Sequence, residues 1–309
     1  MSNATDLKRR FLENAQDVVK QTEQVSINQE ALTKLAQGLK TSGIKLPSWD
    51  DYVDPESLNS NAPIASILRL AQITAQNAGY IYQDGAGNVS KWEKDGSGAK
   101  ALVGEFKKYF RGTSKADLFV GAPYRAERME ILDEMSGAGA IAKLAAIIGA
   151  SQNQDGSHTF DMHAVEGLAK AFPKSYGDDP YRKKALLFFI MTAGHMNAAG
   201  GNVTLDIPAP ADYRLPETLN AAGVIDIAPE LVGRISAGEV FEEDDRLVTA
   251  LRAATIEAVE KICEISGLNV AEVDFGLWNA SRDGTLERLA AESRNDKPTQ
   301  HLKCKTMWF

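Results

Sequence analysis

Apolar residues recur at three- and four-residue spacing along most of the chain, which is the pattern of helices that bury one face. Asn28 and Pro63 are residue types that favour helix starts. Helical runs follow each of them: Ala31, Leu32, Leu35, Ala36 and Leu39 after the first, and Ile64, Ile67, Leu68 and Ala71 after the second. The pattern therefore predicts two helices in the first quarter of the chain.

Three more helices are predicted in the second half. The first opens after Asp178, Asp179 and Pro180 and runs from Tyr181 to about Asn197. The second covers about 243–266 and ends at a glycine, and the third covers about 270–281.

Strand patterns are few. Residues 79–82 and 89–92 flank a glycine-rich turn and predict a small hairpin near 79–92, and residues 203–206 (VTLD) predict one short strand. No alternation of strands and helices is visible. We therefore expect a mainly α fold, a single large helical domain over 1–309, with a small β-hairpin appendage.

Composition narrows the class of protein. The 309 residues include 34 basic and 42 acidic side chains, a net charge of −8, which argues against duplex nucleic acid as the main partner. Two cysteines, Cys263 and Cys304, cannot form a disulfide framework and suit a reducing compartment. The N-terminal residues lack a secretory signal pattern, and the longest apolar run, 185–191, is too short to span a membrane. We expect a cytoplasmic protein without membrane contact.

Familiar catalytic motifs are absent. Residues 95–100 (DGSGAK) have glycines and a lysine at the wrong spacing for a phosphate-binding loop, and no nucleophile elbow occurs. His158 and His163 flank Asp161, which is a weak pattern for a metal site. We therefore expect no metal and no cofactor.

A basic turn opens the predicted helix at 181. Arg182, Lys183 and Lys184 precede a strongly apolar stretch, although the start of a helix disfavours cations. Two interpretations are open. The cations and the helix dipole could together bind an anion, or the turn could be solvated with its lysine stems lying over apolar neighbours.

Two further segments carry candidate chemistry. Prolines stiffen the approach to Asp212 in residues 207–217 (IPAPADYRLPE), so this aspartate is either a catalytic carboxylate or a helix cap. Asp274 and Trp278 are four residues apart and share a helix face, although a tryptophan there is ordinarily core and the aspartate ordinarily an ion-pair partner. The apolar end, 301–309 (HLKCKTMWF), predicts a packed tail.

Together these segments resemble the queuosine salvage protein family. The resemblance rests on their order in the chain: 172–178 (FPKSYGD), 181–185 (YRKKA), 211–216 (ADYRLP), 273–278 (VDFGLW) and the tail after His301. Residues 124–132 (YRAERMEIL) and 11–27 add weaker similarity. The likeness is good from about 120 onward, so 1–115 is a divergent helical part and 116–309 the part similar to the family.

The resemblance implies a fold and an activity. The family is similar in fold to helix-hairpin-helix DNA glycosylases and hydrolyses the N-glycosidic bond of queuosine 5′-phosphate. By this resemblance Asp212 would be the catalytic aspartate. The substrate-binding residues would be Lys183 (with Arg182 or Lys184 assisting at the phosphate), Tyr213, Arg214, Asp274, Trp278 and His301. The partner would be a small modified nucleotide, bound by a monomer.

The sequence also departs from the family pattern. Leu186 stands where the lysine motif has a glutamine, and Ala250 stands where a glutamate precedes the arginine matched by Arg252. A third family segment survives only as a remnant near 77–82. Two alternatives therefore remain: a non-catalytic nucleotide-binding or scaffold protein, and a glycosidase for a different modified nucleotide.

Overall fold

A computed structural model describes residues 4–54, 63–83, 88–283 and 302–308. The described chain is mainly helical, as predicted, and its strands form only two-stranded sheets. It divides into two compact units, each made of separate stretches of sequence: unit 1 is 1–46 with 207–304, and unit 2 is 47–206 with 305–309. The single-domain organisation and the likeness to DNA glycosylases stay predictions.

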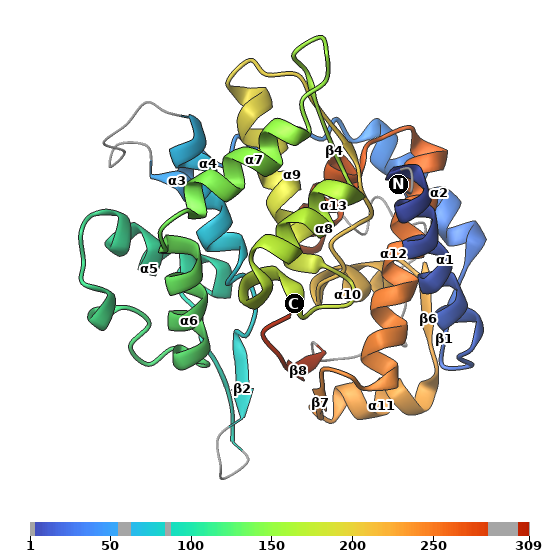
Figure 1. The fold of residues 1–309 in the computed structure, drawn as a ribbon. Helices are drawn as coiled ribbons and strands as arrows, with labels where there is room; N and C mark the ends of the chain where they lie inside the picture. Colours follow the sequence, from blue (N-terminus) through green and yellow to red (C-terminus); the bar gives the residue numbers. More distant parts are fainter. Residues whose placement is uncertain (1–3, 55–62, 84–87, 284–301, 309) are drawn as a thin grey trace. The chain divides into compact units, whose positions relative to one another are not determined.

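Unit 1 is built around one long helix. Its helices are α1 (Ala4–Lys20), α2 (Gln29–Thr41), α10 (Arg214–Ala221), α11 (Pro229–Ser236), α12 (Arg246–Ser266) and α13 (Val270–Asp283). Its strands are β1 (Val25–Ile27), β6 (Ile225–Ile227), β7 (Val240–Glu242) and all but the last residue of β8 (Lys303–Lys305). Helix α12 packs against α1, α2, α10 and α13, and Figure 1 shows α1 in blue lying along α12 in orange.

The sequence explains where α12 begins and ends. The side chain of Asp245 accepts a hydrogen bond from the backbone N–H of Leu247, which caps the first turn. Gly267 adopts a φ of 73° and ends the helix, as predicted, with its N–H bonded to the carbonyl of Cys263. Beside the helix, β1 pairs antiparallel with β6, a pairing that the sequence pattern did not predict.

Unit 2 contains the other helices and the hairpin. Its helices are α3 (Asp50–Val53), α4 (Pro63–Thr74), α5 (Gly98–Phe110), η2 (Lys115–Asp117), α6 (Arg125–Ser136), α7 (Ala140–Ala150), α8 (Met162–Ala171), η3 (Pro173–Gly177) and α9 (Lys183–Ala198). Its strands are β2 (Ile81–Gln83), β3 (Val89–Lys91), β4 (His158–Asp161) and β5 (Val203–Asp206).

Helix α9 forms the core of unit 2. It packs against α4, α8 and β5, and its aromatic residues Phe188 and Phe189 are fully buried. The ring of Phe189 lies 4.8 Å from that of Phe160 and 5.0 Å from that of Phe188, measured between centroids. The helix starts at Lys183 rather than Tyr181 because Arg182 adopts a left-handed backbone with a φ of 53°.

The small strands confirm two predictions. Strands β2 and β3 form the expected hairpin, with Tyr82 opposite Ser90. Strand β5 forms at 203–206, and it pairs in parallel with β4, which the sequence did not predict. Within the described parts of the chain, no helix combines the length and the apolar character needed to cross a membrane.

Candidate active site

Asp212 lies at the start of α10 in unit 1. Its Oδ1 accepts hydrogen bonds from the backbone N–H of Arg214 (2.8 Å) and of Leu215 (3.0 Å), so the residue acts as a helix cap. The side chain is half-buried, and among the described residues its second oxygen, Oδ2, has no hydrogen-bond partner. The cap therefore fixes the carboxylate while leaving one oxygen for another group.

A buried arginine binds the backbone of the turn before Asp212. Arg252 on α12 is 2% exposed, and its Nε donates to the carbonyl of Ala211 at 3.0 Å. Ile207, Ala209 and Ala211 are almost fully buried, which anchors the proline-rich approach. The sequence analysis named Arg252 only as the match to an arginine of the family pattern. It did not predict that Arg252 positions this turn, because an isolated arginine is ordinarily a surface residue.

Tyr213 and Arg214 follow Asp212 directly at the start of α10. Burial, and then the neighbouring carboxylate of Asp212, raise the pKa of Tyr213 to about 12, so its phenol stays protonated near neutral pH. The guanidinium of Arg214 lies 5.8 Å from the centroid of the Tyr213 ring and pairs with Glu217 at 3.2 Å. Arg214 is therefore already engaged by an aromatic face and a carboxylate.

Helix α13 brings a second aromatic group into unit 1. It packs against α10, and it carries Trp278, stacked on Phe275 with 6.5 Å between ring centroids. The guanidinium of Arg282 lies 4.5 Å from the centroid of a Trp278 ring, and its charge opposes the rise in the pKa of Tyr213. The charge of Arg282 thus acts on both Trp278 and Tyr213. The sequence analysis did not single out Arg282, although its spacing of four residues from Trp278 was an available signal.

Asp274 and Trp278 are both half-buried on α13, as expected for residues that share a helix face. Lys183 belongs to unit 2 and is described with that unit. His301 lies outside the described residues. The tail beyond it is packed: Leu302, Cys304 and Thr306 are each less than a tenth exposed.

The basic turn at the start of α9 is buried rather than solvated. Lys183 and Lys184 are 4% and 5% exposed. The backbone N–H of Lys183 donates to Asp179 Oδ2 at 2.8 Å, and its Nζ donates to the carbonyl of Asn77. Arg182 forms a two-pronged pair with Glu166. The structure thus does not support the solvated alternative.

A buried arginine organises the loop that receives Lys183. Arg128 on α6 is fully buried and donates to the backbone carbonyls of Gln76, Ala78, Gly79 and Pro123 at 2.8–3.0 Å. Its guanidinium lies 4.9 Å from the centroid of a Trp92 ring. The sequence analysis included Arg128 only as part of segment 124–132. Its role could not be predicted, because no local pattern marks an arginine that binds backbone carbonyls far away in the chain.

No group of three or more side chains suitable for a metal ion occurs within the ranges that the structure describes. His158, His163 and Asp161 do not form such a group: Asp161 Oδ1 instead caps α8 through the N–H groups of His163 and Ala164. The residues present offer hydrogen bonds, charges and aromatic faces.

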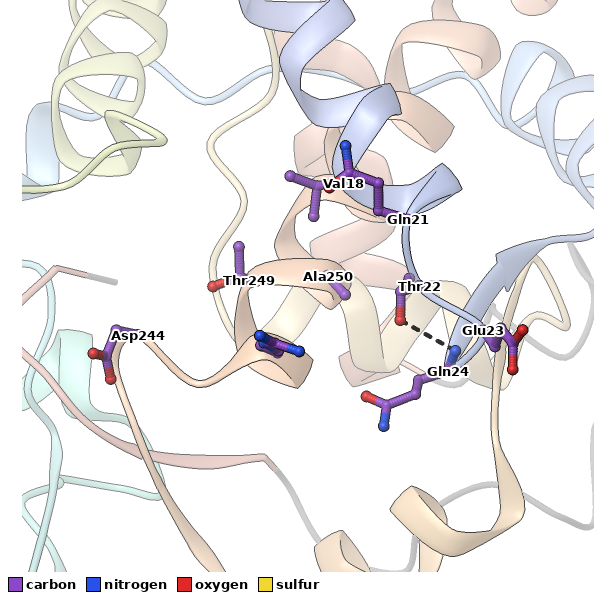
Figure 2. Close-up of a pocket in the computed structure, with 9 residues that line it drawn as sticks. Val18, Gln21, Thr22, Glu23, Gln24, Asp244, Thr249 and Ala250 are labelled. Atoms are coloured by element: carbon purple, nitrogen blue, oxygen red, sulfur yellow. Dashed lines mark hydrogen bonds between the residues drawn. The ribbon is translucent and has the colours of Figure 1, made fainter.

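Unit 1 also contains a cavity of about 670 Å³ between the end of α1 and the start of α12. Figure 2 shows its polar lining, including Thr22 and Gln24 from the segment after α1 and Thr249 from α12. Ala250, where the family pattern has a glutamate, also lines it. None of the predicted site residues that the structure describes lines this cavity.

The fold and the capped carboxylate define a mainly α protein that holds an anchored aspartate beside aromatic side chains. Residues 204–309 match the family model described as queuosine salvage protein. The match confirms the resemblance over the C-terminal third, which contains Asp212, Asp274 and Trp278, and it supports a role in queuosine salvage. No curated protein matches the chain.

Proposed function

We propose that the protein hydrolyses the N-glycosidic bond of queuosine 5′-phosphate, or of a related modified nucleoside 5′-monophosphate, and releases the base and ribose 5-phosphate. The observation that carries this proposal is the state of Asp212. Two backbone N–H groups fix one carboxylate oxygen, and the other makes no hydrogen bond within the described chain. A carboxylate fixed in this way stabilises the positive charge that develops on the sugar as the glycosidic bond breaks.

In this mechanism Asp212 also orients, or deprotonates, the attacking water. Since a 7-deazapurine lacks the N7 atom that ordinary purine hydrolases protonate, the leaving base needs hydrogen bonds at its other edges, and Asp274 is our candidate. The rings of Tyr213 and Trp278 are candidates for stacking on the base, with the Tyr80 and Tyr82 rings of the hairpin region as further ones.

The remaining predicted residues bind the rest of the substrate in this proposal. Lys183 binds the 5′-phosphate, with its Nζ also held by the carbonyl of Asn77. Arg214 and His301 contribute further polar contacts. We also propose that the protein acts as a cytoplasmic monomer on free nucleotide rather than on duplex nucleic acid, in keeping with its charge of −8.

One observation favours a related base over queuine itself. Leu186, at the position of the family's glutamine, is fully buried on α9, so this position offers no hydrogen bond to a base. A glycosidase for a different modified nucleotide is therefore our second candidate. Incubation with a panel of nucleoside 5′-monophosphates that includes queuosine 5′-phosphate separates the candidates, because the substrate that yields free base identifies the specificity.

The test of the mechanism is Asp212→Asn. The amide oxygen can still cap α10, so the variant should fold, while the loss of the negative charge should reduce the rate of base release about 10²–10⁴-fold. Asp245→Asn is the matched control, because Asp245 caps α12 in the same unit and should leave the rate unchanged. Base release by Asp212→Asn at the wild-type rate would refute the proposed role, and no release by the wild type from any nucleotide would favour a binding or scaffold protein.

A further inference from the structure

The cavity between α1 and α12 is lined by none of the described residues that we assign to hydrolysis. Its volume of about 670 Å³ lies in the range that is typical of small-molecule sites. Segment 21–24 forms one wall, and the start of α12 forms the other, with Ala250 on that wall (Figure 2). Because all of the lining residues belong to unit 1, the cavity is a property of that unit alone.

Three charged side chains line this cavity: Glu23, Asp244 and Arg246. None of them forms a hydrogen bond or an ion pair with a described residue, whereas Arg234 in the same unit pairs with Glu239. All three are exposed to solvent, so a ligand can reach them without a change in the fold. The cavity therefore offers one cation and two anions to a bound molecule.

The arrangement of these three charges defines the ligand that would complement them. Asp244 and Arg246 stand on either side of the helix cap Asp245, so an anion and a cation lie close together at the start of α12. Glu23 lies across the cavity from Asp244 (Figure 2). A complementary molecule carries a cation beside an anion at one end and a second cation at the other end.

The uncharged lining suits the middle of such a molecule. Val18 and Ala250 provide apolar contacts, and the side-chain amides of Gln21 and Gln24 form no hydrogen bond with any described residue. An aliphatic chain can pack against the two apolar side chains, while the amides bind polar atoms of the ligand.

We propose that this cavity binds a free basic α-amino acid, of the class of arginine and lysine. The α-carboxylate of the ligand binds the guanidinium of Arg246, which can form two parallel hydrogen bonds with it. The α-ammonium binds Asp244, and the cation of the ligand's side chain binds Glu23. The lining has one excess negative charge and a basic amino acid has one excess positive charge, so the two neutralise each other.

The experiment is calorimetric titration of the full chain with L-arginine, agmatine and L-glutamine near neutral pH and at low ionic strength, since salt screens exposed charges. Agmatine is arginine without its carboxylate, and glutamine lacks the side-chain cation. The wild type should bind L-arginine. It should bind each of the other two probes about 5- to 20-fold more weakly, because one charge-assisted hydrogen bond is lost in each case.

Two variants test the individual contacts. Arg246→Gln should weaken the binding of L-arginine about 5- to 20-fold but should not weaken that of agmatine, which has no carboxylate for Arg246 to bind. Glu23→Gln should weaken the binding of L-arginine but not that of L-glutamine. Arg10→Gln is the matched control and should retain the wild-type affinities, because Arg10 is an exposed arginine of α1 that does not line the cavity.

The substituted side chains are all exposed, so the three variants should fold as the wild type does. No binding of L-arginine by the wild type, equal affinities for L-arginine and agmatine, or unaltered binding of L-arginine by Arg246→Gln would each overturn the assignment. None of these measurements involves a nucleotide or its hydrolysis, so a failure of the glycosidase proposal leaves this result standing, and the reverse also holds.

Discussion

The starts of α9 and α10 satisfy their backbone N–H groups in the same way but differ in charge. Asp179 accepts from the backbone N–H groups of Tyr181 and Lys183 before α9, and Asp212 accepts from two N–H groups at α10. The start of α10 thus carries the negative side chain that a helix dipole favours. The start of α9 adds two buried lysines, against both the dipole and the cost of burial. The comparison teaches that two helix starts with similar backbone capping can differ widely in electrostatic cost.

The largest expected effect concerns Arg128, which supports the loop beside α9. Arg128→Met should lower the free energy of unfolding by about 3–5 kcal/mol, because four buried carbonyls lose their donor. Urea unfolding of purified protein measures this. Arg125→Met is the control on the same helix: Arg125 also binds carbonyls but is exposed, and the variant should lose less than about 1 kcal/mol. Similar losses in both variants would mean that burial does not distinguish the two arginines.

A smaller effect of opposite sign is expected at Lys184. The pKa of Lys184 falls from 10.5 to about 8 on folding, so between these values the unfolded chain holds a proton that the folded chain has released. The wild type should therefore gain stability as the pH rises through this window, and the full penalty of up to about 3 kcal/mol is present below it. Lys184→Met should be about 1–3 kcal/mol more stable near pH 7.

The wild type should become more stable as the pH rises from about 8 to about 10, whereas Lys184→Met should show no such increase in the free energy of unfolding. Unfolding in urea at three pH values across the window measures both effects, with Lys170→Met as the exposed reference. If Lys184→Met were less stable than the wild type near pH 7, the ammonium would be stabilising and the contrast between the two helix starts would disappear.

The smallest expected effect belongs to the α10 cap. Asp212→Ala should lower the free energy of unfolding by about 1 kcal/mol, since two N–H groups lose their acceptor, whereas Asp212→Asn should change it by only a few tenths. Asp245→Ala at α12 offers a comparison of the same kind. Thermal or urea unfolding gives the values. Equal stability of Asp212→Ala and the wild type would show that the carboxylate does not hold the turn.

The hairpin and five helices, α2, α4, α9, α12 and α13, could be predicted because their signals are local. Asn28 caps α2 as expected, and Gly267 ends α12. The β4–β5 pair was missed because its two strands are some forty residues apart in sequence and their pairing depends on contacts that no short window shows.

The candidate site shows the same limit. Asp212 was predicted with both of its interpretations, and the cap is observed, whereas its catalytic role remains the proposal above. The burial of Lys184 and the carbonyl contacts of Arg128 could not be predicted, because a run of basic residues reads the same whether it faces water or the interior.

The discontinuous make-up of unit 1 has a consequence for its biosynthesis. Helices α1 and α2 bury their apolar faces against α12, and β1 pairs with β6, yet about two hundred residues separate α2 from α12 in the chain. At about 5–20 residues per second, the ribosome needs about 10–40 s to make this stretch. The first two helices therefore leave the ribosome well before their partner exists, while all but the last few residues of unit 2 are synthesised as one continuous run. The assembly of unit 1 must therefore wait until α12 has been translated.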